Sequence, residues 1–155
     1  DILGMETDDI IIKKTKEILA RAGIEVEVES NAHSEIATNY VNIVTYDARL
    51  LIGPRGESLF ALEYLLKRIL EKELGEAPKF FLDVNSYRFH HIETLKEEAK
   101  QIAKKVRLYR KELMLKPMAP FERRIIHMTL AEYPDITTES VGEGERRRVV
   151  IKPYP

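Results

Sequence analysis

The hydrophobic pattern of the first half of the chain switches repeatedly between the period of a helix and that of a strand. Apolar residues three and four positions apart indicate amphipathic helices, whereas alternating apolar and acidic residues over 24–29 indicate a half-buried strand. Thr7, which precedes two aspartates, is predicted to cap the first helix. The sequence predicts helices at 8–22, 48–52 and 57–74, and strands at 24–29, 40–46 and 79–84. A turn is predicted at 31–34, between the first two strands.

The second half of the chain predicts a further small unit. Pro120 stands where the first position of a helix is expected, since its fixed φ suits that position. The segment 142–144, Gly-Glu-Gly, predicts a hairpin turn between two strands. The expected order is helix, strand, helix, strand and strand over residues 86–111, 112–118, 120–133, 136–141 and 146–152. We therefore expect the α+β fold class, with two closely joined domains over residues 1–85 and 86–155.

Charge is distributed unevenly along the chain. The whole sequence has a formal net charge of -1, which by itself argues against a nucleic-acid-binding protein. Residues 104–155, however, carry 12 Lys and Arg against 7 Asp and Glu, a net charge of +5. Two interpretations stay open at this point: chance clustering of charges on solvated faces, or a basic C-terminal unit that meets phosphate groups.

Composition and spacing argue against several classes of protein. The absence of cysteine excludes disulfides and thiolate metal sites and fits a reducing compartment, so we expect a cytoplasmic protein. No apolar run approaches the ~20 residues that cross a bilayer, and we expect no membrane insertion. Neither metal-ligand spacing nor a catalytic or nucleotide-binding motif is present, so we expect no metal, no cofactor, no catalytic residue and no enzyme. The first residue is Asp1, which suggests a fragment of a longer protein.

The motif Gly53-Pro54-Arg55-Gly56 lies between two predicted helices. Gly53 and Gly56 allow a ligand to approach the backbone, Gly56 opens a helix with unpaired amides, and Arg55 adds charge. A GxxG motif alone is more typical of an ordinary turn between two helices than of a binding loop. In this order of elements, residues 8–85 resemble a type II KH domain, in which the loop clamps nucleotide backbone. Pro54 departs from that use because it has no N–H to donate.

Arg123 and His127 stand one helical turn apart, on one face of a predicted helix. Phe121, Ile125 and Met128 are predicted to face the core, so Arg123 and His127 should point away from it. Arginine offers a planar fork to phosphate, and histidine offers a donor and a flat ring. A random exposed pair would look the same, but further cations lie near in sequence: Lys116, Arg124, Arg146, Arg147 and Arg148.

The segments KPMAPFERRIIH (116–127) and TTESVGEGERRRVVI (137–151) together resemble the R-3-H domain, whose members bind single-stranded nucleic acid. A KH-like unit followed by this domain resembles the bacterial Jag or SpoIIIJ-associated family, also called KhpB. The resemblance implies binding of single-stranded RNA, with single-stranded DNA as a second ligand, in regulation linked to cell elongation and division. It also implies a short KH protein as partner. The expected binding residues are Gly53, Arg55, Gly56, Lys116, Arg123, Arg124, His127, Arg146, Arg147 and Arg148.

An alternative function is that of an interaction adaptor. In this interpretation the KH-like unit docks a partner protein or forms a homodimer. Pro54 favours it, as does the acidic strand with Glu25, Glu27 and Glu29.

Overall fold

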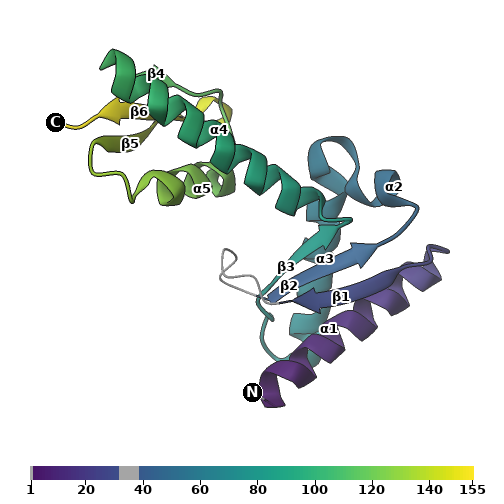
Figure 1. Ribbon diagram of the computed structural model, residues 1–155. Helices are drawn as coiled ribbons and strands as arrows, with labels where there is room; N and C mark the ends of the chain where they lie inside the picture. Colours follow the sequence, from purple (N-terminus) through teal and green to yellow (C-terminus); the bar gives the residue numbers. More distant parts are fainter. Residues whose placement is uncertain (1, 32–38) are drawn as a thin grey trace. The chain divides into compact units, whose positions relative to one another are not determined.

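The structure, a computed structural model, describes residues 2–31 and 39–155 (Figure 1). The chain divides into two compact units, with the division between Arg88 and Phe89. The predicted turn at residues 31–34 lies outside the described residues apart from Asn31. Both units combine helices with a small sheet, which confirms the predicted α+β class.

The first unit holds a three-stranded sheet and three α-helices among its described residues. The sheet order is β1-β2-β3, with β1 and β2 antiparallel and β2 and β3 parallel. The elements are α1 (Ile2–Arg21), β1 (Glu27–Asn31), β2 (Asn39–Val44), α2 (Ala48–Ile52), α3 (Glu57–Leu74) and β3 (Phe80–Val84), with a 3₁₀ turn at Pro54–Gly56. The order of helices and strands is the one that the hydrophobic pattern predicts.

The predicted cap at Thr7 is wrong, because α1 begins at Ile2 and continues through Thr7. The neighbouring Asp8 has a different role. Its carboxylate accepts hydrogen bonds from the side chains of Ser30 at 3.2 Å and Asn39 at 2.5 Å. Asp8 thereby ties α1 to the ends of the two antiparallel strands.

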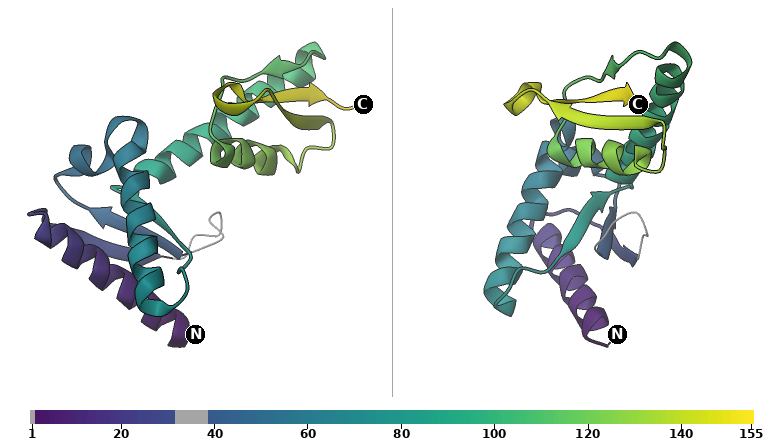
Figure 2. Two further views of the ribbon diagram at one scale, coloured as in Figure 1. Left: turned by 180° about the vertical axis from the view of Figure 1, so that it is seen from behind. Right: turned by 90° about the vertical axis from the view of Figure 1, so that its left-hand side faces the viewer.

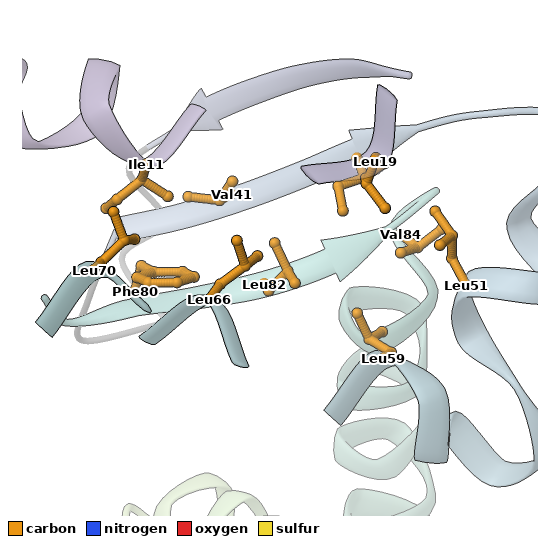
Figure 3. Packing of buried hydrophobic residues seen from close by; sticks show 11 residues of the cluster. Ile11, Leu19, Val41, Leu51, Leu59, Leu66, Leu70, Phe80, Leu82 and Val84 are labelled. Carbon is orange, nitrogen blue, oxygen red and sulfur yellow. The ribbon is translucent and has the colours of Figure 1, made fainter. Parts of the chain in front are cut away.

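One hydrophobic core holds the first unit together, between the sheet and the helices α1 and α3, which cover the same face (Figures 2 and 3). Ile11 of α1, Val41 of β2 and Leu66 of α3 are fully buried. Burial of each such side chain stabilises the fold by roughly 1.5–3 kcal/mol. The core therefore fixes α3, and with it the loop that precedes α3.

Arg88 and Glu63 close the outer edge of β3. The Leu82 N–H donates to the Glu63 carboxylate at 2.8 Å, and the Leu82 carbonyl accepts from Arg88 at 2.9 Å. Arg88 and Glu63 also pair with each other at 2.7 Å, and the guanidinium stacks on the Phe81 ring at 3.6 Å. The free N–H and C=O of an edge strand are thus occupied by side chains of the same unit.

The second unit is a three-stranded antiparallel sheet with two helices among its described residues. The strand order is β4-β6-β5, which places β6 in the centre. The elements are α4 (Tyr87–Tyr109), β4 (Leu113–Met114), α5 (Pro120–Leu130), β5 (Ile136–Val141) and β6 (Arg148–Pro153), with a 3₁₀ turn at Gly144–Arg146.

Both α4 and α5 pack on one face of this second sheet. Ala99 and Ala103 of α4 and Leu130 of α5 join Val149 and Ile151 of β6 in a shared cluster. The two alanines let α4 lie close to the strands. Among the described residues, no helix of this unit contributes to a cluster on the opposite face of the sheet.

Met128 does not face this core, so that part of the sequence prediction is wrong. Met128 is 60% exposed, whereas Ile126 is 1% exposed and takes the inward position. The helix carries two overlapping apolar stripes, one with Met128 and one with Ile126 and Leu130. The sheet receives the second stripe, which rotates α5 and carries Arg123 and His127 toward the strands.

Candidate nucleic-acid interface

His127 lies against β5 instead of pointing away from the core, and the predicted orientation is wrong. Its Nδ1 lies 2.6 Å from the Thr138 hydroxyl and its Nε2 lies 2.8 Å from the Ser140 hydroxyl. Thr138 and Ser140 are two positions apart on β5, so both project from the same face of the strand. The ring can be half-buried because both of its nitrogens find a partner there.

Two effects keep the imidazole of His127 uncharged. Burial lowers the pKa of His127 below its ordinary value, and the nearby positive charge of Arg123 lowers it further. A neutral imidazole has one nitrogen that donates and one that accepts. At neutral pH, His127 is therefore a polar hydrogen-bonding group and not a cation.

Arg123 lies at the start of α5, where backbone contacts hold it in place. Its guanidinium donates to the Met118 carbonyl at 2.7 Å, and the Met118 N–H donates to the Arg147 carbonyl at 3.2 Å. Arg123 and the backbone of Arg147 are thus linked through a single residue. Among residues 2–31 and 39–155, no carboxylate lies within ion-pair distance of Arg123.

Glu122 is the acid next to Arg123 in sequence, and it is engaged elsewhere. Its carboxylate accepts from the Ala119 N–H at 2.8 Å, which caps α5, and contacts His91 at 2.5 Å. These contacts direct the negative charge of Glu122 toward the cap and α4. The guanidinium of Arg123 therefore keeps N–H groups that an outside anion can reach.

The three arginines before and within β6 do not share one surface. Side chains alternate along a strand, so Arg147 has the orientation of Val149, toward the helices, and Arg148 projects from the opposite face. The Arg147 guanidinium donates to the Gly142 carbonyl at 2.8 Å. Arg148 instead donates to the Arg146 carbonyl at 3.1 Å. The exposed Arg146 is the last residue of the 3₁₀ turn that precedes β6.

We assign Lys116, two residues beyond the end of β4, to the same face as Arg148 from the alternation of side chains. The segment after β4 continues along β6, since the Leu115 N–H donates to the Val149 carbonyl at 2.9 Å. Met114 pairs with Val150, and Lys116, two positions later, has the same orientation. The predicted cations therefore form two groups. We call Arg123, Arg147, His127, Thr138 and Ser140 the helix-side cluster, and Lys116 and Arg148 the outer-face pair. Arg124 is exposed on α5 beside the helix-side cluster.

The GxxG loop lies in the first unit and is shaped by a close approach to α3. A Cβ added at Gly53, which has φ of 68°, would lie 2.1 Å from the Ser58 hydroxyl, so only glycine fits there. The Gly56 N–H donates to the Gly53 carbonyl, and the Glu57 N–H donates to the Pro54 carbonyl. Two loop amides are thus used within the loop, and the exposed Arg55 is its charged group.

Comparisons with known proteins agree with the geometry of the second unit. Residues 93–153 match the R-3-H domain family, and this span contains the whole helix-side cluster. A Clostridium symbiosum protein named "RNA-binding protein KhpB" is 38% identical over 128 residues, 83% of this chain and 57% of the relative. The chain belongs to the KhpB family. The Bacillus subtilis KhpB is 42% identical over 106 residues, 67% of this chain and 51% of the relative. The Streptococcus pneumoniae KhpB is 27% identical over 154 residues, 96% of this chain and 47% of the relative.

The predicted resemblance of residues 116–127 and 137–151 to the R-3-H domain is thus confirmed, as is the resemblance to the KhpB family that the order of the two units indicates. The chain spans about half the length of the curated KhpB relatives that it matches. Within the described residues, no helix is both long and apolar enough to span a bilayer. The same residues contain no group of three or more side chains that could hold a metal ion.

Thr138 and Ser140 are the two residues of this KhpB-family site that sequence reasoning missed. Both share a strand face with the buried Ile136, so they are polar residues on the face that a strand turns toward its core. The sequence contains this information, because side chains alternate along a strand. Once Ile136 is placed toward the core, Thr138 and Ser140 must lie on the same face. Their partner, His127, becomes evident only when α5 and β5 are placed side by side.

Proposed function

We propose that this chain binds single-stranded RNA through its R-3-H domain at the helix-side cluster, with Arg123 and Arg147 of that cluster and Arg124 as the phosphate contacts. The observation that carries the proposal is that Arg123 and Arg124 of α5, and Arg147, whose carbonyl accepts from Met118, form no ion pair with any carboxylate of the described residues. The names of the KhpB relatives support RNA as the ligand. The 2′-hydroxyl would distinguish RNA from single-stranded DNA, which we propose as the weaker ligand.

Arg123 is the central contact of this surface. One of its N–H groups is held by the Met118 carbonyl, which fixes the plane of the guanidinium. The remaining donors can form a fork with two oxygens of one phosphate. Arg124 on α5 and Arg147 before β6 extend the surface, and we propose the exposed Arg146 and the outer-face pair as additional phosphate contacts.

The GxxG loop is proposed as a second, weaker contact. Arg55 supplies its charge, and Gly53 and Gly56 allow close approach of the nucleotide backbone. Because Pro54 has no N–H, the loop contributes less than the helix-side cluster. We extend the family resemblance to a non-enzymatic, cytoplasmic regulator of RNAs that affects cell elongation or division.

A binding assay with charge-matched variants tests the proposal. The full chain is titrated into a fluorescein-labelled single-stranded RNA of mixed sequence, and fluorescence polarisation is measured. We expect Arg123→Ala with Arg147→Ala to weaken binding roughly tenfold or more, since two phosphate contacts are lost. The control, Lys13→Ala with Arg21→Ala, removes the same charge from the exposed side of α1 and should bind as the wild type does. Equal affinity of the first variant and the wild type at low salt would contradict the proposal.

An adaptor function of the first unit is the second candidate, and exposed apolar residues on α3 favour it. Phe60, Tyr64 and Leu65 are 50%, 64% and 56% exposed on neighbouring turns of the helix. Apolar groups of this size gathered on one helix face are typical of a surface that meets another protein. We propose a short KH protein or a second copy of the chain as the partner. Light scattering of the RNA-free chain should then show a dimer that Tyr64→Lys dissociates, whereas a monomer would exclude the homodimer.

A further inference from the structure

We infer that His127 acts on RNA through Thr138 and Ser140, whose hydroxyl groups contact a phosphate while the imidazole orients them. This inference rests on the proposed function and names residues that the proposed phosphate contact uses. It makes His127 a positioning residue. The two hydroxyls, neither of which is charged, then become binding residues beside the arginines.

The hydrogen bonds of His127 show that its imidazole is already bound within the protein. Both ring nitrogens are occupied, Nδ1 by Thr138 and Nε2 by Ser140, at 2.6 and 2.8 Å. No ring N–H is left to donate to a phosphate, so direct recognition by the imidazole would require both bonds to break. The sequence predicts the imidazole as a phosphate contact, but both of its nitrogens already bind side chains of β5.

The hydrogens of the imidazole and of the two hydroxyls determine which group can still donate. In neutral His127 one nitrogen donates to a hydroxyl oxygen, and the other nitrogen accepts a hydroxyl hydrogen. The hydroxyl that accepts from the ring keeps its own hydrogen free, whichever tautomer is present. The pair therefore always offers one oriented O–H donor to an outside acceptor, and a phosphate oxygen is such an acceptor. A chain from ring N–H to hydroxyl to phosphate also strengthens each bond by polarisation.

The two hydroxyls lie close to residues that belong to the proposed phosphate contact. Thr138 and Ser140 are half-buried on β5, which lies beside α5 (Figure 1). Arg123 faces His127 from α5 closely enough to lower its pKa. Gly142, two residues after Ser140, holds the Arg147 guanidinium. A phosphate that meets the two arginines would thus lie next to the free O–H.

A change of pH supplies a readout that a merely structural histidine would not give. Arg123 is the charged group that faces His127 from α5, while Thr138 and Ser140 face it from β5 and do not titrate. Their partners on β6, Ile151 and Val149, are apolar. Protonated His127 would donate from both nitrogens and free both hydroxyl hydrogens for the phosphate. Bound RNA should therefore raise the pKa of His127 and bind more tightly as the pH falls from 7.5 to about 6.

A mutant cycle on the full chain tests the inference, with the labelled RNA described above. We expect His127→Phe, the double variant Thr138→Val with Ser140→Ala, and the triple variant to lose affinity to the same extent, roughly tenfold. Thr138→Ser and Ser140→Thr keep the hydroxyls and should keep the affinity. NMR of the ¹⁵N-labelled imidazole should show an upward shift of the His127 pKa when RNA is added. Thermal unfolding of each variant shows whether it is folded.

The outcomes separate this inference from the proposed function. If Arg123→Ala with Arg147→Ala weakens binding but the hydroxyl-free double variant binds as the wild type does, the inference fails and the proposed function holds. A triple variant much weaker than the double variant would also overturn it, because His127 would then contact RNA by itself. If neither the arginine nor the hydroxyl variants change the affinity, both the inference and the proposed function fail. Should a variant not fold, an unchanged imidazole pKa in the RNA-bound wild type overturns the inference.

Discussion

Removal of Arg123 and Arg147 should change how strongly RNA binding depends on salt. The structure offers three arginines to phosphate on the helix side, Arg123, Arg124 and Arg147. Each phosphate that is neutralised on a single strand contributes about -0.7 to the slope of log K against log salt, which gives about -2.1 for three. A fourfold rise in salt, from 50 to 200 mM, would then weaken this contribution about 18-fold.

The double variant Arg123→Ala with Arg147→Ala retains one of these contacts. Its slope should be smaller in magnitude by about 1.4, and the same rise in salt should then weaken the remaining contribution only about 2.6-fold. The comparison of slopes makes the contribution of all other cations cancel. The assay is fluorescence polarisation across a salt series, with Lys13→Ala and Arg21→Ala as the charge-matched control.

The two possible causes of weakened binding give different results in this assay. Loss of phosphate contacts changes the slope, whereas damage to the fold lowers the affinity equally at every salt concentration. A variant with weaker binding and the wild-type slope would therefore refute the reasoning. A control variant with a reduced slope would refute it as well, because the salt dependence would then report overall charge.

Three further predictions concern stability. Ile126→Ala should destabilise the second unit by about 2–5 kcal/mol in denaturant unfolding, because Ile126 is buried. Met128→Ala should change the stability by no more than about 0.5 kcal/mol, because Met128 is exposed. A larger loss for Met128→Ala than for Ile126→Ala would show that α5 packs on the sheet by the stripe that contains Met128. Gly53→Ala should destabilise the first unit by more than about 1 kcal/mol, because the new Cβ meets Ser58, and thermal unfolding at the wild-type temperature would contradict this. The pKa of His127 in the folded state lies below its unfolded value of about 6.5, so the unfolded state binds more protons. The contribution of neutral His127 to stability is therefore full above pH 6.5 and declines as the pH falls below that value. His127→Phe should reduce this decline when unfolding is measured as a function of pH.

The sequence is sufficient for the order of the elements and for the glycines that bound them. Gly56 and Gly75 stand at the two ends of α3, as their positions around the leucine repeat predict. The family match rests on a segment whose residues are adjacent in sequence. These features are local, so their physical causes can be read from neighbouring residues.

The orientation of α5 could not be read from the sequence in the same way. Ile125 belongs to both apolar stripes of α5 and is buried. Whether Met128 or Ile126 is buried beside it depends on how the sheet packs against the helix. That choice decides where His127 points. That Arg147 and Arg148 lie on opposite faces follows from the alternation along a strand, but which of the two faces the helices cover is supplied only by the fold.

Amide chemical shifts of the ¹⁵N-labelled chain, followed during titration with single-stranded RNA, show whether RNA binds at the helix-side cluster. We expect the largest shifts at Arg123, Arg124, Ser140 and Arg147, with smaller shifts on the outer face of β6 and at the GxxG loop. Shifts confined to the first unit, or concentrated around Lys152 with none at the start of α5, would contradict this expectation.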